Sequence, residues 1–223
     1  MKAKRNMQIA VDVIMTAILL VQMSYSIAGE LLHEISGIAF FVLFAVHHIL
    51  SLNNTKALFK GNHSSDKVVK IIVDIVLFLI IICMMLSALP ISKYVFTFFG
   101  INGFSSLGRT VHMLGAYWGF ALMNIHIGFH LDIMLKKPLK DKKKKPFVLT
   151  ALFAVFFAGL VMFIKEGVYK YMLLINRFAF FDMKGGLPLF LLKYILIGGM
   201  FASLGYLLIN VIKRKGKAYE HNN

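Results

Sequence analysis

The sequence predicts an all-α membrane protein of about six transmembrane helices, and three observations lead to this fold class. Of the 223 residues, 59% are hydrophobic, and the mean hydropathy is +0.76. The apolar residues form long runs, whereas soluble domains are only about half apolar. The charged residues lie between and beyond these runs, so the net charge of +15 favours a basic rim at one membrane surface over a nucleic-acid-binding face.

Six apolar runs are each long enough for a helix to cross the hydrocarbon core of a bilayer, which takes about 20 residues. In lipid, a helix lets such a run satisfy its own backbone hydrogen bonds. In chain order the predicted spans are 7–27, 31–52, 68–89, 111–135, 146–164 and 187–212.

The positions of Lys and Arg predict the orientation. Seventeen of them lie at the amino terminus, between the second and third spans, between the fourth and fifth spans and in the carboxyl-terminal tail, against six on the other side. Basic residues collect on the cytoplasmic side, so we expect both termini there. The second and fourth spans then run in the same direction, from outside to inside.

These two parallel spans each carry a pair of histidines at the same interval. His33 and His47 are 14 residues apart, and so are His112 and His126. Fourteen helical residues cover about 21 Å and return to within about 40° of the same face. His33 and His112 are therefore expected at an outer level, and His47 and His126 at an inner level. Paired imidazoles at two depths predict two b-type haems, each held by two histidines.

The predicted architecture is a four-helix bundle that holds both haems, followed by two additional carboxyl-terminal spans. Such haems transfer electrons, because two axial histidines leave no open position on the iron. With one cysteine, Cys83, and no Cys-x-x-Cys-His motif, the haems would not be covalently attached. Gly37, Gly115 and Gly119 lie near the histidine faces and would let a porphyrin approach the backbone. Arg109 is a candidate partner for a haem propionate.

Several alternatives remain open for the polar residues. Intramembrane histidines also pair helices through hydrogen bonds, and zinc binds imidazoles, although it favours ligands at one level. His48 or His130 could replace an inner ligand, touch propionates or a quinone, or lie at the interface. For Asp12 and Asp74, pairing with Lys70 or a place at the interface is favoured over proton relay to a quinone.

Two features are assigned to the outer side. Glu34 either forms a hydrogen bond at the edge of the outer haem or faces water. The connection 165–186 is long and aromatic, and we expect it to cap the outer haem or lie at the interface. The predicted organisation is a haem-binding bundle at 1–135, a cytoplasmic Lys-rich loop at 136–146, and a helical hairpin with a basic tail at 147–223.

Four stretches together resemble the flavinylation-associated cytochromes, a bacterial family formerly described as a domain of unknown function. They are LHEISGIAFFVLFAVHHIL, LSALPISKYVF, GRTVHMLGAYWGF with HIGFH, and YMLLINRFAFFD, and the resemblance covers nearly the whole chain. It implies a multi-pass dihaem cytochrome of the bacterial cytoplasmic membrane, with His33, His47, His112 and His126 as ligands. It also implies a partner protein that carries covalently attached flavin outside this membrane.

The predicted function is electron transfer across the membrane. An inner donor, either a quinol or a reductase, would reduce the haem at the inner level, and the electron would leave from the outer level to a flavoprotein. The reverse direction is also possible. The alternatives are a haem-binding anchor or assembly subunit without turnover of its own, and a haem-free transporter or metal permease. Whether the protein belongs to an enzyme is left open.

Overall fold

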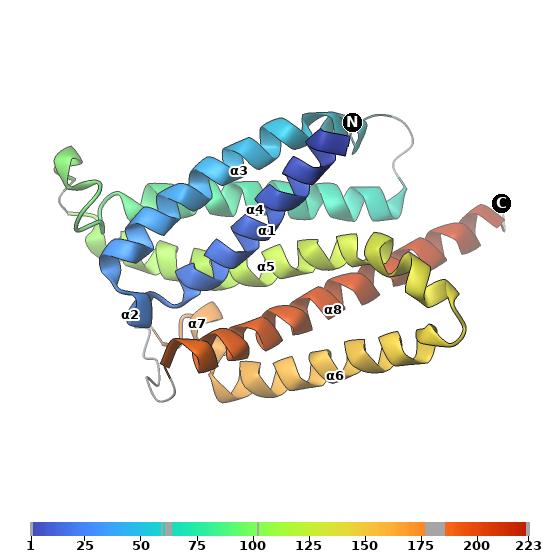
Figure 1. Ribbon diagram of the computed structural model, residues 1–223. Helices are drawn as coiled ribbons and strands as arrows, with labels where there is room; N and C mark the ends of the chain where they lie inside the picture. The colour runs from blue at the N-terminus through green and yellow to red at the C-terminus, as the bar shows by residue number, and fades with distance from the viewer. Residues whose placement is uncertain (1, 59, 61–63, 102, 177–185, 222–223) are drawn as a thin grey trace.

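The computed structural model describes residues 2–58, 60, 64–101, 103–176 and 186–221, and all regular secondary structure in these ranges is helical. The elements are α1 (Lys2–Met23), α2 (Tyr25–Ala28), α3 (Glu30–Leu58), α4 (Ser65–Ala88), the 3₁₀ helix η1 (Thr97–Phe99), α5 (Ser105–Lys140), α6 (Lys144–Lys165), α7 (Val168–Met172) and α8 (Gly186–His221). Figure 1 shows the long helices side by side in one elongated bundle.

Within the described residues, five helices are long and apolar enough to cross a membrane. They are Ala3–Met23, Glu30–Asn53, Ser65–Ala88, Lys144–Lys165 and Gly186–Gly216, and they coincide with five of the six predicted spans. Large apolar side chains are exposed on the outward faces of these helices, where water would be an unfavourable neighbour. The structure therefore supports a multi-pass membrane protein.

The predicted fourth span, 111–135, lies within α5 but is not among these five helices. This helix is 36 residues long, so its length is sufficient. Its three histidines and one asparagine lower its hydropathy. Polar residues are acceptable at this position because α4, α7 and α8 all pack against α5 and cover much of its surface.

The carboxyl-terminal hairpin is attached to the rest of the bundle through α8, which lies between α5 and α6 (Figure 1). Glycines allow the helix backbones to come very close. A Cβ atom on Gly128 would lie 2.2 Å from the carbonyl oxygen of Ala202, and one on Gly205 would lie 2.3 Å from that of Ile125. Such close packing of small residues is typical of helix pairs in membranes.

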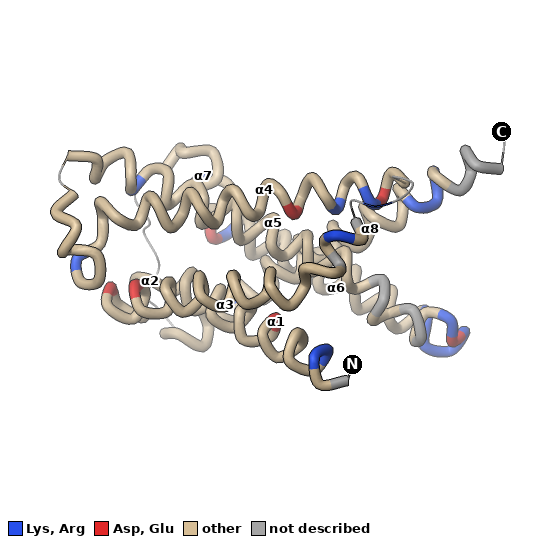
Figure 2. The backbone as a smooth tube through the Cα atoms, turned by 90° about the horizontal axis from the view of Figure 1, so that it is seen from above, with Lys and Arg blue, Asp and Glu red and all other residues tan. Residues whose placement is uncertain are grey.

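The amino-terminal half consists of two antiparallel helix pairs. α1 packs on α3 and α4 packs on α5, whereas α3 makes only a small contact with α4. α1 begins and α8 ends at the same end of the bundle, which we call the inner end (Figure 1). Lys and Arg residues gather towards this end (Figure 2), as the predicted topology requires.

The predicted Lys-rich loop at 136–146 is mostly helical. α5 continues to Lys140 and α6 begins at Lys144, so only residues 141–143 join the two helices. Lysine is a good helix former, and a helix that leaves the apolar layer can continue in water. The loop boundary predicted from charge alone was therefore wrong.

Candidate cofactor-binding site

A cavity of about 700 Å³ opens between the two helix pairs, in the half of the bundle away from the termini. Its size lies within the usual range of ligand sites, about 300–1,000 Å³. It is lined by six of the eight predicted cofactor-binding residues, namely His33, Gly37, Arg109, His112, Gly115 and Gly119. Most of the remaining wall is apolar and comes from α3, α4 and α5.

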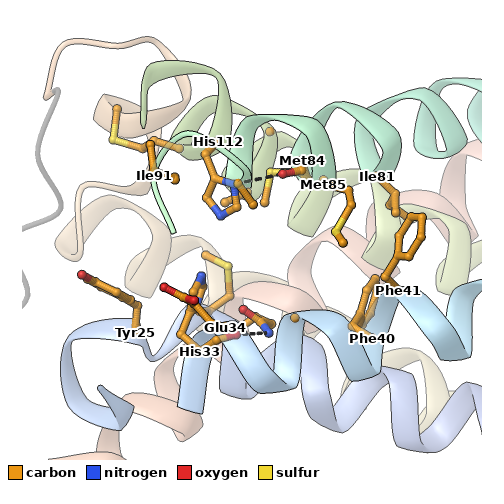
Figure 3. A pocket seen from close by; sticks show the side chains of 18 of the residues that line it. Tyr25, His33, Glu34, Phe40, Phe41, Ile81, Met84, Met85, Ile91 and His112 are labelled. Carbon is orange, nitrogen blue, oxygen red and sulfur yellow. Dashed lines mark hydrogen bonds between the residues drawn. The ribbon is translucent and has the colours of Figure 1, made fainter. Parts of the chain in front are cut away.

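The two outer histidines face one another across this cavity (Figure 3). The ring centroids of His33 and His112 are 6.0 Å apart, with their planes inclined at 69°. Two imidazoles that share one metal centre in line, with nitrogen–metal bonds of about 2.0 Å, have centroids roughly 6.2 Å apart. The outer pair therefore already has the separation that a single shared iron requires.

The hydrogen bonds of His112 leave a nitrogen free for a metal. Its Nδ1 atom lies 3.2 Å from the carbonyl oxygen of Met84 and 3.2 Å from the hydroxyl of Ser87. Because a carbonyl oxygen only accepts, Nδ1 carries the proton, and Nε2 keeps its lone pair. The Nδ1 atom of His33 is buried, with no hydrogen-bond partner among the described residues. A buried polar atom without a partner is costly, which suits a site that a ligand completes.

Two of the predicted glycines keep the α5 wall of the cavity flat. A Cβ atom on Gly115 would lie 2.7 Å from the sulfur of Met84, and one on Gly119 would lie 3.1 Å from a methyl group of Ile80. Any side chain at these positions would displace its neighbour or project into the cavity. The prediction that small residues border the histidine face at these two positions agrees with this geometry.

Glu34 holds the connection between α4 and α5 over the outer mouth of the cavity. Its carboxylate accepts hydrogen bonds from the hydroxyl of Ser92 at 2.7 Å and from the backbone N–H groups of Lys93 at 2.7 Å and Val95 at 2.8 Å. Ser92 and Lys93 themselves line the cavity. Glu34 thus lines the cavity while its carboxylate holds the loop, so it is not simply a side chain in water.

Charged groups surround the same mouth. The Lys93 ammonium binds the Glu30 carboxylate, which also accepts a hydrogen bond of 2.9 Å from the Tyr25 hydroxyl. The bond to Glu30 raises the pKa of Lys93, and burial together with the bond to Glu30 raises the pKa of Tyr25. Arg109 adds a further positive charge on the cavity wall. Lys93 is paired with Glu30, so Arg109, which has no ion-pair partner among the described residues, is the charge at this end that is available to a carboxylate of a ligand.

The predicted cap at 165–186 lies elsewhere in its described part. α7 packs against α5 and α6, and its residues Val168, Tyr171 and Met172 are buried. None of residues 165–176 lines the cavity, and 177–185 lie outside the described residues. The aromatic character that suggested a cap serves packing instead, since Tyr171 stacks on Tyr117 with centroids 4.8 Å apart. For this described part the predicted cap was wrong, and the alternative, a place at the interface, stays a prediction.

At the inner level, each predicted ligand has a carboxylate partner. His47 Nδ1 forms a hydrogen bond of 2.7 Å with Asp12 of α1, and His126 Nδ1 lies at ion-pair distance, 2.8 Å, from Asp74 of α4. Because a carboxylate oxygen accepts, His47 holds its proton on Nδ1 and leaves Nε2 available. The contact of His126 with Asp74 is an ion-pair distance that lacks hydrogen-bond geometry. The predicted pairing of these aspartates with Lys70 was therefore wrong for the described residues, whereas their place at the interface stays a prediction.

The inner rings are not arranged like the outer ones. Within the described residues, no ring contact joins His47 to His126. His126 instead lies against His130, with centroids 4.9 Å apart, and Asp12, Asp74 and Lys70 all act on His130 electrostatically. The inner level is therefore a polar group drawn from four helices rather than a closed pair of rings.

His48 has partners of its own. Its Nδ1 atom lies 3.0 Å from the carbonyl oxygen of Phe44. Its ring packs against the rings of Phe44 and Phe78, with centroid distances of 4.2 and 5.5 Å. His47, in contrast, has the carboxylate partner that matches the partner of His126. This match favours His47 over His48 as the inner ligand on α3.

No family model, curated protein or solved structure matches this chain. The interpretation of the site therefore depends on its own residues. Across the described residues, no group of three or more His, Cys, Asp or Glu side chains is arranged to hold a bare metal ion. Two imidazoles at metal-sharing distance, an apolar cavity, glycines beside the histidine of α5 and an arginine on the cavity wall fit haem better than zinc.

Proposed function

We propose that this protein is a b-type dihaem cytochrome that carries electrons across the bacterial cytoplasmic membrane. The observation that carries the proposal is the outer pair, whose rings stand 6.0 Å apart across a cavity of about 700 Å³. Haem held by two imidazoles supplies a one-electron ferric–ferrous couple with no open coordination position. The resemblance of the sequence to flavinylation-associated cytochromes agrees with this proposal.

The residues of the chain have distinct parts in the proposed function. His33 and His112 hold the outer haem, and His47 and His126 hold the inner one. The Nδ1 hydrogen bond of His112 to Met84 fixes its ring, and the aspartate partners of the inner histidines do the same. The mostly apolar cavity wall surrounds the outer level.

The proposed topology places the inner end of the bundle in the cytoplasm, because the basic residues gather there (Figure 2). A quinol or a cytoplasmic reductase is the proposed donor at this side. A quinol gives up two electrons, one at a time, and releases two protons. The proposed acceptor is a flavoprotein outside the membrane, whose flavin takes up two electrons.

Haem analysis of the purified protein tests the proposal. Pyridine haemochrome assay is expected to give two haem b per chain, with a Soret band that shifts on reduction. A protein without Soret absorption would contradict the proposal and leave the haem-free transporter as the explanation.

Proteoliposomes then separate an electron conduit from a haem-binding anchor. With a quinol supplied at one side and membrane-impermeant ferricyanide at the other, a conduit reoxidises its haem continuously and consumes ferricyanide. Liposomes without the protein give the background rate. Haem that becomes reduced and stays reduced would support the anchor and contradict transfer across the membrane.

A further inference from the structure

The two levels differ in the charge of the groups that support the histidines. At the inner level, His47 and His126 each face a carboxylate, at 2.7 and 2.8 Å. At the outer level, His112 has only a backbone carbonyl and a hydroxyl as partners, both at 3.2 Å. The structure thus gives the inner level two negative partners and the outer level neutral ones.

We infer that Asp12 and Asp74 are positioning residues that give the inner haem site the lower reduction potential, so that electrons run from the inner to the outer side. The inference rests on the proposed function. A carboxylate beside Nδ1 raises the basicity of Nε2 as a metal ligand, both where it accepts the Nδ1 hydrogen bond, as Asp12 does, and where it lies at ion-pair distance, as Asp74 does. It thereby stabilises ferric over ferrous iron, and hydrogen bonding of this kind is one of the main means by which a protein sets a haem potential.

Other charges also act around the two levels. Arg109 lines the outer cavity, where a positive charge stabilises the reduced state. Of the negative charges nearby, Glu30 is paired with Lys93, whereas Glu34 keeps its charge because its hydrogen-bond donors are neutral, and it lies beside His33 without touching a ring nitrogen. At the inner level, Lys70 opposes the aspartates as a single positive charge that acts near His130.

The direct contacts therefore decide the order of the potentials. Two carboxylates touch the inner ligands, whereas Lys70 acts from a greater distance, and in the low dielectric of a membrane interior the closer charges have the larger effect. The transfer moves one electron between the levels, and no bond forms or breaks. A quinol supplies the electrons at the inner side and a flavin takes them up at the outer side.

Redox potentiometry on the purified dihaem protein tests the inference with D12N and D74N. Asparagine keeps a side-chain oxygen as acceptor but removes the charge. Each substitution is expected to raise the lower midpoint potential by about 59 mV, which is a tenfold change in the equilibrium constant of a one-electron reduction. The upper midpoint potential should stay unchanged. Ser87→Ala, which removes a neutral partner at the outer level, is the matched control and should not move the lower midpoint.

A second measurement leaves the aspartates in place, in case the asparagine variants lose haem. His112→Ala keeps the inner haem, and this haem is expected to titrate at the lower of the two wild-type midpoints. Titration at the upper midpoint would overturn the inference, as would unchanged midpoints in D12N and D74N proteins that retain two haems. Either result leaves the proposed function intact, whereas a wild-type protein without haem refutes the proposed function itself.

Discussion

The outer and inner histidine levels have the same spacing in the sequence but are built differently. At the outer level, two rings from α3 and α5 already stand at metal-sharing distance around an apolar cavity. At the inner level, each histidine is bound to an aspartate on the neighbouring helix of its own pair. The difference teaches that helix spacing sets the depth of a ligand, while the adjacent helix sets its chemical character.

α4, the helix that is paired with α5, contacts the histidines of α5 at both levels. Asp74 contacts the inner histidine of α5, and Ser87, 13 residues later, contacts the outer one. Thirteen residues cover about 20 Å, which matches the 14-residue interval on the antiparallel α5. α1 repeats this arrangement in part, because Asp12 binds His47 and Gln22 donates to the backbone carbonyl of His33 at 3.0 Å.

Loss of a ligand gives the largest expected effect, and it tests whether the two levels are separate sites. H112A and H126A are each expected to retain one haem b per chain by pyridine haemochrome assay, because one imidazole of the affected pair is gone. H48A is the control and should retain two. Full haem content in H112A would refute the outer site, and loss of a haem in H48A would move the inner ligand from His47 to His48.

The fold was predicted well where apolar run length decides it. Five of the six predicted spans match helices that can cross a membrane. α5 is not among these helices, because the residues that make it a candidate for function also lower its hydropathy. Charge could not predict the end of α5, since lysines are as compatible with helix as with loop.

The candidate site was predictable in its depth but not in its contacts. Equal intervals on two parallel helices predicted that His33 and His112 share a level, and their rings do meet. The aspartate partners were missed because periodicity within one helix does not show which neighbour it faces. Lys70 is one helical turn from Asp74 in sequence, yet Asp74 pairs with His126 across the interface. Comparing polar residues at equal depth on adjacent helices would have found this pair.

Filling the outer cavity is expected to lower the haem content of the outer level alone, by somewhat less than the loss of a ligand does. G115L places a branched side chain against Met84, whose sulfur would lie 2.7 Å from a Cβ atom at this position, and fills space beside His112. Most of the outer haem should be lost, while the inner haem and its midpoint are retained. G216L on α8 is the control, because no atom lies within 4 Å of its Cβ position. Equal haem content in both variants would show that the cavity is not the outer haem site.

Removal of the cationic charge at the cavity mouth is expected to weaken the outer level only. R109Q loses a charge-assisted hydrogen bond to a propionate, worth about 1.5–3 kcal/mol, so haem at the outer level should dissociate about tenfold or more faster. Transfer of haem to an excess of apomyoglobin measures this rate. K165Q, on an exposed lysine that does not line the cavity, is the control and should behave as wild type. Equal rates of haem dissociation in the two variants would show that Arg109 does not bind a haem propionate.

The smallest expected effect comes from the loop that covers the outer cavity. E34Q keeps the size of the side chain but weakens the hydrogen bonds from Ser92, Lys93 and Val95, because these donors then meet a neutral amide oxygen. Bonds to a charged group are worth roughly 1–2 kcal/mol more than neutral ones, so the melting temperature should fall by a few degrees. S92A, which removes one donor, should fall by less. Because the loop lies over the outer level, the outer haem should bleach before the inner haem on heating, and simultaneous bleaching would show that the loop supports both levels equally.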